Sequence, residues 1–88
     1  MRIWFKIFED TRLVKTETIE DFSEETRTHK IFDALDKASH LFDLSVPIWL
    51  DSNVKEFQKN GTTRFNQDNF IEEIEFDYLE MQILEEDF

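Results

Sequence analysis

The sequence predicts a single α+β domain spanning residues 1–88, with a small, mainly antiparallel sheet, one long helix on one face of it and a second short helix. Three observations predict this fold class. Apolar and polar residues alternate near both ends of the chain, as in half-buried strands, and a long segment between them has the period of an amphipathic helix. Hydrophobic residues make up 40% of the chain and aromatic residues 15%, which is enough apolar surface to offset the entropy of folding.

Residues 2–9 are expected to form the first strand, because large apolar side chains recur there at every second position. The other face of this strand mixes aromatic and basic side chains: Arg2, Trp4, Lys6 and Phe8. The polar run Glu9–Arg12 is typical of a turn. Leu13–Ile19 is rich in β-branched residues and returns as the second strand of a hairpin, and its charged side chains suit a sheet edge.

A long helix is expected from Ser23 to Phe42. Ser23 is a favourable N-cap, and the two glutamates that follow it would lie in the first turn, where the helix dipole favours anions. The apolar side chains of this segment fall on one helical stripe, made up of Ile31, Leu35, Ala38 and Phe42. Polar residues occupy the opposite side.

A short third strand is expected at Ile48–Leu50, because the single proline before it prevents the long helix from continuing. Asp51 can cap a second, short helix that runs from residue 52 to about residue 59. Gly61, which adopts a left-handed conformation readily, would end this helix. Residues 62–69 have no clear periodicity and are expected to form a loop.

The C-terminal segment, residues 74–84, also alternates, but its apolar phase changes between Tyr78 and Leu79. A β-bulge at that point would reconcile the two phases. Alternatively, Phe70–Ile74 forms a helical turn and the strand begins at Glu75, which is the interpretation we prefer. One face of this last strand is then aliphatic, and the other carries Phe76, Tyr78, Glu80 and Gln82.

The faces of the last strand match those of the first, which predicts that the two strands are neighbours. Glu80 would then face the basic side chains of Arg2 and Lys6, and each cross-strand pair of opposite charges contributes about 0.2–1 kcal/mol. The predicted strand order is 2-1-4, with the short third strand at an edge. The long helix is expected to cover the aliphatic face.

The charge of the chain is unevenly distributed. The formal net charge is -11, and residues 65–88 contain nine acidic residues and no basic one. This charge disfavours direct binding to nucleic acid. The negative charge favours binding to a basic protein partner. Alternatively, the protein is an acidic mimic of nucleic acid that blocks a basic nucleic-acid-binding protein. Solubility alone is the simpler explanation of the acidity.

The composition also excludes several kinds of site. The chain has no cysteine, so disulfides, thiolate metal sites and cysteine nucleophiles are excluded. No apolar run approaches the length of a membrane span, and we expect a cytoplasmic protein with no membrane partner. No phosphate-binding loop, dinucleotide fingerprint or zinc spacing is present. We therefore expect no metal, no cofactor, no catalytic residues and no enzymatic activity.

Two groups of residues are candidate sites. The first is a candidate anion-binding or phosphate-binding site near the start of the long helix, made up of the basic residues Arg27, His29 and Lys30. Arg64 would join this basic cluster if the loop at residues 62–69 folds back. Salt bridges to nearby acidic residues are the alternative explanation of this cluster. The second sheet face is a candidate interface, made up of Trp4, Lys6, Phe8, Phe76, Tyr78 and Glu80. The alternative is that the short helix and the loop at residues 62–69 cover it.

Four segments resemble those of a family of small, uncharacterised bacterial proteins: Thr26–Phe32, Pro47–Asp51, Asp68–Glu72 and Phe76–Glu80. The resemblance implies a free-standing cytoplasmic protein and carries no activity with it. From the residues, we expect a small non-catalytic protein-interaction module that self-associates as a homodimer or binds a partner protein.

Overall fold

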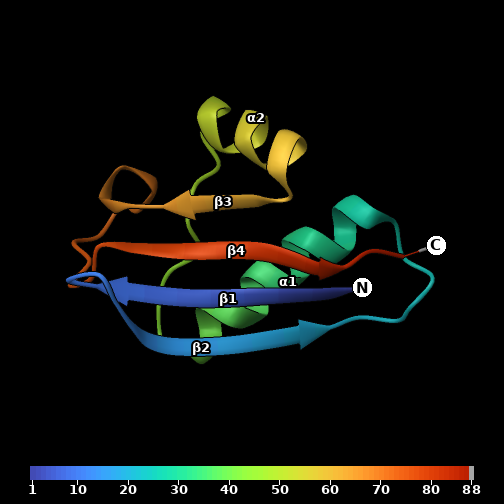
Figure 1. Ribbon diagram of the computed structural model, residues 1–88, viewed down its shortest axis with the longest axis horizontal. Helices are drawn as coiled ribbons and strands as arrows, with labels where there is room; N and C mark the ends of the chain where they lie inside the picture. Colours follow the sequence, from blue (N-terminus) through green and yellow to red (C-terminus); the bar gives the residue numbers. More distant parts are fainter. Residues whose placement is uncertain (88) are drawn as a thin grey trace.

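The computed structural model describes residues 1–87 and shows a four-stranded antiparallel sheet with helix α1 packed across one of its faces (Figure 1). The strand order is β2-β1-β4-β3, so the predicted fold class and the predicted order 2-1-4 are both confirmed. The elements are β1 (Arg2–Glu9), β2 (Arg12–Glu20), α1 (Arg27–Leu41), α2 (Asp51–Asn60), β3 (Thr62–Phe65), the 3₁₀ turn η1 (Gln67–Asn69) and β4 (Tyr78–Glu85).

Strand β1 lies between β2 and β4 at the centre of the sheet. Trp4 lies opposite Thr18 of β2 on one side and opposite Gln82 of β4 on the other. The β1–β2 hairpin turns through Asp10 and Thr11, which both have positive φ angles, as a tight two-residue hairpin turn requires. A bulge interrupts this pairing between Ile7 and Phe8 and shifts the register of β2 by one residue.

Helix α1 begins later than the sequence predicts. Its N-cap is Thr26, whose hydroxyl accepts a hydrogen bond from the backbone N–H of His29 at 3.2 Å. Ser23 instead lies in a turn held by Asp21, whose carboxylate accepts from the Ser23 N–H at 2.9 Å. The two glutamates that follow Ser23 therefore precede the helix, and its first turn contains no acidic residue. The predicted apolar stripe is confirmed, because all four of its side chains are buried.

The predicted third strand at Ile48–Leu50 is wrong, and the short edge strand is formed by residues 62–65 instead. The N–H of Ile48 donates to the Asn69 carbonyl at 2.7 Å, and the Ile48 carbonyl accepts from the Asn69 side chain at 2.7 Å. Because η1 satisfies these two groups, they are not free to pair with a strand. Strand β3 pairs with β4 and places Thr63 and Phe65, both fully buried, on the core side.

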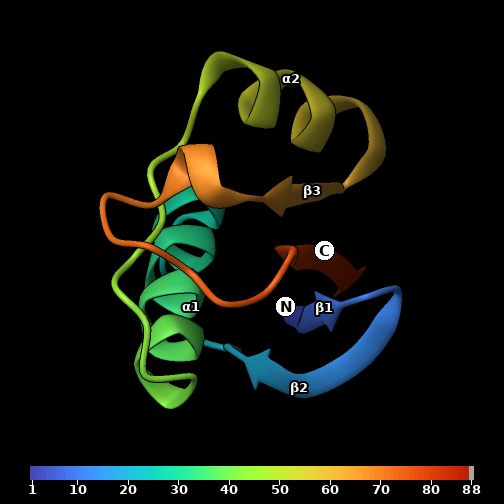
Figure 2. The same ribbon diagram turned by 90° about the vertical axis from the view of Figure 1, so that its left-hand side faces the viewer.

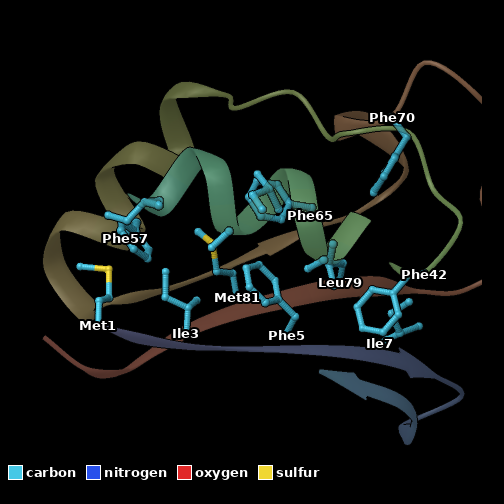
Figure 3. Packing of buried hydrophobic residues seen from close by; sticks show 14 residues of the cluster. Met1, Ile3, Phe5, Ile7, Phe42, Phe57, Phe65, Phe70, Leu79 and Met81 are labelled. Atoms are coloured by element: carbon cyan, nitrogen blue, oxygen red, sulfur yellow. The ribbon is translucent and has the colours of Figure 1, made fainter. Parts of the chain in front are cut away.

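The hydrophobic core lies between α1 and the sheet, where aliphatic and aromatic side chains of β1, β3 and β4 meet the helix (Figure 3). Phe5, Leu79 and Met81 are fully buried near its centre. Trp49 extends the core towards α2, and its ring meets those of Phe57 and Phe65 edge to face at 5.6 and 5.3 Å between centroids. These contacts attach α2 to the β3 side of the sheet.

A buried amide network also holds α2, β3 and η1 together. The Asn53 side chain is 5% exposed, and its nitrogen donates to the Thr63 hydroxyl and to the Arg64 carbonyl, each at 2.9 Å. Its oxygen accepts from the Leu50 N–H at 3.0 Å and from the Asn69 side chain at 2.7 Å. Each buried polar group of the network thus has a partner, which is the condition for burial at low cost.

We predict that Asn53→Ala lowers the free energy of unfolding by about 2–3 kcal/mol, because it leaves several buried donors and acceptors without partners. Urea denaturation followed by circular dichroism measures this change. Asn60→Ala, at an exposed position of the same helix, is the matched control and should change the value by less than about 0.5 kcal/mol. Equal values for the two variants would contradict a structural role for the network.

Candidate functional site

One face of the sheet carries no helix or loop within residues 1–87. Helix α1 lies behind the opposite face, and α2 lies beyond β3 at the edge (Figures 1 and 2). The short helix and residues 62–69 therefore leave the second face uncovered. The side chains of this open face are Arg2, Trp4, Lys6, Phe8, Leu13, Thr16, Thr18, Glu20, Thr62, Arg64, Tyr78, Glu80, Gln82 and Glu85.

Lys6 lies at the centre of the open face and is only 7% exposed. Its ammonium nitrogen is 2.9 Å from Glu80 Oε1 and donates to Gln82 Oε1 at 2.8 Å. The same nitrogen lies 3.9 Å from the centroid of the Trp4 ring, a cation–π contact. Burial of an ammonium group is costly unless it is paired, and these three neighbours satisfy it. The same contacts fix the positions of the Trp4, Glu80 and Gln82 side chains around the Lys6 ammonium group.

Arg64 extends this network towards the β3 edge. Its Nε donates to Glu80 Oε2 at 3.1 Å, and its guanidinium carbon lies 4.5 Å from the centroid of the Tyr78 ring. Tyr78 in turn stacks on Phe8, with 5.1 Å between centroids. The guanidinium group is therefore oriented by a carboxylate and an aromatic ring, while its side chain remains 60% exposed.

Trp4 is held from the β2 side of the sheet, where its Nε1 donates to the Thr16 hydroxyl at 2.6 Å.

Glu80 joins the Lys6 and Arg64 parts of the network, because its carboxylate contacts both side chains. Burial alone would raise the pKa of the Glu80 carboxyl group, but the hydrogen bonds from Lys6 and Arg64 outweigh this effect and lower it. Glu80 is therefore ionised at neutral pH. The hydrogen bond to Glu80 likewise raises the pKa of the Arg64 guanidinium group.

Phe76 does not belong to the open face with the other predicted interface residues. It precedes β4, which begins at Tyr78 rather than at Glu75, so strand alternation does not apply to it. Its ring packs against the core and meets the buried Phe70 ring edge to face at 6.0 Å. The other five predicted interface residues, Trp4, Lys6, Phe8, Tyr78 and Glu80, do lie together.

The predicted anion-binding residues are not brought together. Arg27 pairs with Glu86, with 2.9 Å between Nη2 and Oε2, and this hydrogen-bonded carboxylate raises the pKa of Arg27. Lys30 is 3% exposed and lies 2.5 Å from an Asp87 oxygen. His29 is exposed on α1, and the predicted fourth member, Arg64, pairs with Glu80 on the far side of the sheet.

The partners of the basic cluster come from the C-terminal tail, at Glu86 and Asp87, and the sequence does not predict that this tail contacts α1. The hydrogen bond from Lys30, followed by that from the Met1 amino group at 2.7 Å, lowers the pKa of Asp87. One signal is present in the sequence, since Lys30 precedes Ala34 by one helical turn and so lies beside the apolar stripe rather than opposite it. A lysine there needs a carboxylate partner.

Apart from Glu80, which lies within β4, the acidic residues of the C-terminal third lie at opposite ends of this strand. The loop before β4 borders a cavity of about 410 Å³ together with the end of α1 and the β1–β2 hairpin. The carboxylates around this cavity belong to Glu9, Asp43, Glu72, Glu73 and Glu75. The acidic tail, by contrast, follows the far end of β4 and reaches the start of α1 (Figure 1).

Residues 1–87 contain no helix that is long and apolar enough to cross a membrane. They also contain no group of three or more histidine or acidic side chains placed to hold a metal ion. Comparison of the chain with protein-family models, with curated proteins and with solved structures finds no match.

We predict that Glu80→Gln lowers the free energy of unfolding at pH 7 by about 2 kcal/mol, because it leaves Lys6 buried beside a neutral amide. Since the folded protein lowers the pKa of Glu80, the carboxylate stabilises the protein fully above its ordinary pKa, about 4.5. That stability is lost as the pH falls through the lowered value. The gap between wild type and variant should therefore be constant from pH 7 to about pH 5 and shrink at lower pH.

Denaturation curves recorded at several pH values test this prediction. Glu85→Gln is the matched control, since Glu85 lies on the same strand but is half-exposed and 3.9 Å from Arg2. Exposed pairs of this kind contribute about 0–1 kcal/mol. A Glu80→Gln gap that stays constant down to the acid transition would contradict the lowered pKa.

Proposed function

We propose that the protein is a non-catalytic protein-interaction module that binds a partner protein through the open face of its sheet. The observation that carries the proposal is the uncovered network of Trp4, Lys6, Arg64, Tyr78 and Glu80 at the centre of the sheet. Tryptophan, tyrosine and arginine dominate the energetic centres of protein interfaces. Because internal contacts already fix these side chains, binding would order little that is not ordered beforehand.

Charge indicates what kind of partner the open face suits. This face carries Arg2, Lys6 and Arg64 against the carboxylates of Glu20, Glu80 and Glu85, so it is locally neutral, in a chain whose formal net charge is -11. It therefore avoids the repulsion that the rest of the surface would impose on another acidic protein. We infer a partner surface with an apolar centre, which covers the aromatic rings, and a carboxylate that reaches the exposed Arg64 guanidinium group.

The geometry does not favour the two other functions considered from the sequence. An acidic mimic of nucleic acid needs its carboxylates in a row on one surface, whereas here they are divided between two ends of the molecule. Glu80, Glu86 and Asp87 are also engaged by basic side chains. An anion-binding site needs free converging cations, and Arg27 and Lys30 each have a carboxylate partner. We place the module in the cytoplasm, which suits a chain without cysteine.

Site-specific photo-cross-linking tests the proposal. A photoreactive phenylalanine analogue at Tyr78 should yield discrete protein adducts in cells that naturally contain the protein, because it would lie inside the interface. The same analogue at Phe32, a half-exposed aromatic position on α1, is the matched control and should yield none. Adding Trp4→Glu, which places a charge on the open face, should abolish the Tyr78 adducts.

Adducts from Phe32 alone, or no adducts from either position, would contradict binding through the open face. Circular dichroism of each variant shows whether it is folded. This check matters because Trp4 contacts the buried ammonium of Lys6.

A further inference from the structure

The two edges of the sheet differ in how their outer backbone groups are satisfied. At the β3 edge, the Arg64 N–H donates to Glu56 Oε1 at 3.1 Å and the Arg64 carbonyl accepts from Asn53 at 2.9 Å, so that α2 side chains close this edge. Strand β2 forms the other edge, pairs only with β1, and is exposed at seven of its nine positions. Within residues 1–87 no hydrogen bond reaches its outer backbone groups. A long unpaired edge is a template for another strand.

The sequence of β2 is complementary to itself. If two copies pair antiparallel about Thr16, Lys15 of each copy lies opposite Glu17 of the other, and the two Thr16 side chains face each other. Two neighbouring registers also keep the side chains of each face of β2 on the same side of the combined sheet. The register centred on Lys15 places two lysines opposite each other, and the register centred on Glu17 places two glutamates opposite each other. The strand therefore favours one register and disfavours the next on either side.

Strand β2 is also electrically neutral in a strongly acidic chain. It carries Arg12 and Lys15 against Glu17 and Glu20, so two copies can meet there without the repulsion between their other surfaces. An apolar groove lies beside this edge between β2 and α1, where Ile19 is close to Leu41, which is 59% exposed. A second copy at the edge would cover part of this apolar surface.

We propose that a second copy of the chain pairs along the β2 edge, from Val14 to Thr18, to form a two-fold symmetric dimer with a continuous eight-stranded sheet. The bulge at the hairpin end limits the pairing, since it shifts the faces of β2 beyond Val14. Lys15 and Glu17 lie opposite Ile7 and Phe5, on the helix side of the sheet. Their pairing therefore places both helices on one side of the dimer and both open faces on the other.

The dimer deepens the proposed function, on which this step rests. From the strand lengths and the usual strand spacing, one open face covers about 450 Å². A stable protein interface uses about 800 Å² on each partner. Two open faces side by side reach that size, so the dimer would convert two small surfaces into one of ordinary extent.

A charge-exchange experiment tests the dimer on the full chain. Sedimentation velocity over a wide range of concentrations should show wild-type dimers. Lys15→Glu places glutamates opposite each other, and Glu17→Lys does the same with lysines, so each should raise the dimer dissociation constant at least about tenfold. An equimolar mixture of the two variants should form heterodimers, because both carboxylates of the first variant then lie opposite the two ammonium groups of the second.

Lys55→Glu and Glu24→Lys change the net charge by the same amounts at exposed positions away from β2, and both should dimerise like wild type. A wild-type chain that is monomeric at every concentration would overturn the proposal. So would a dimer that tolerates both β2 variants but is lost in Trp4→Glu, because that dimer would use the open face. Since the Tyr78 cross-links report on a partner at that face and the charge exchange on the β2 edge, failure of one proposal is distinguishable from failure of the other.

Discussion

The pairing of β1 with β4 is the constraint on which the rest of the structure depends. It makes the N-terminal strand central rather than peripheral, which leaves β2 at one edge and β3 at the other. It brings Phe5 opposite Met81 in the core and Lys6 opposite Glu80 on the open face. The same strand pair therefore supplies both the apolar layer under α1 and the polar network on the other side of the sheet. Loss of this pairing would remove the core and the candidate site together.

Much of the fold could be predicted because its main elements are long enough for periodicity to show. The alternation of residues 2–9 and the helical stripe of residues 31–42 each leave few other arrangements. Strand β3 could not be found in this way, because four residues give only two inward positions, one of them the threonine Thr63. The sequence does not locate the start of α1, because Ser23 and Thr26 are both capping residues and only the surrounding turn decides between them.

The residues of the candidate site are likewise predictable where they lie within strands and not where they lie in loops. Trp4, Lys6 and Glu80 were found because they lie within strands, where position along the chain determines the face of the sheet. The prediction for Phe76 is wrong because this residue lies in the loop before β4, where strand alternation does not apply. The partners of Lys30 were not visible because the acidic tail reaches α1 through tertiary structure alone. Contacts of this kind have no local signal in a sequence.

The arrangement of the sheet also has a consequence for the order of events during synthesis. Strand β1 leaves the ribosome before the other strands of the sheet, yet its partner β4 is made only after α1, α2 and β3. Until then the growing chain holds the β1–β2 hairpin with the other edge of β1 unpaired, because closing a contact between distant segments requires both of them. Completion of the tertiary fold must therefore wait for residues 78–85 to emerge. During that interval the chain also lacks most of its net negative charge, because nine acidic residues and no basic one lie within residues 65–88.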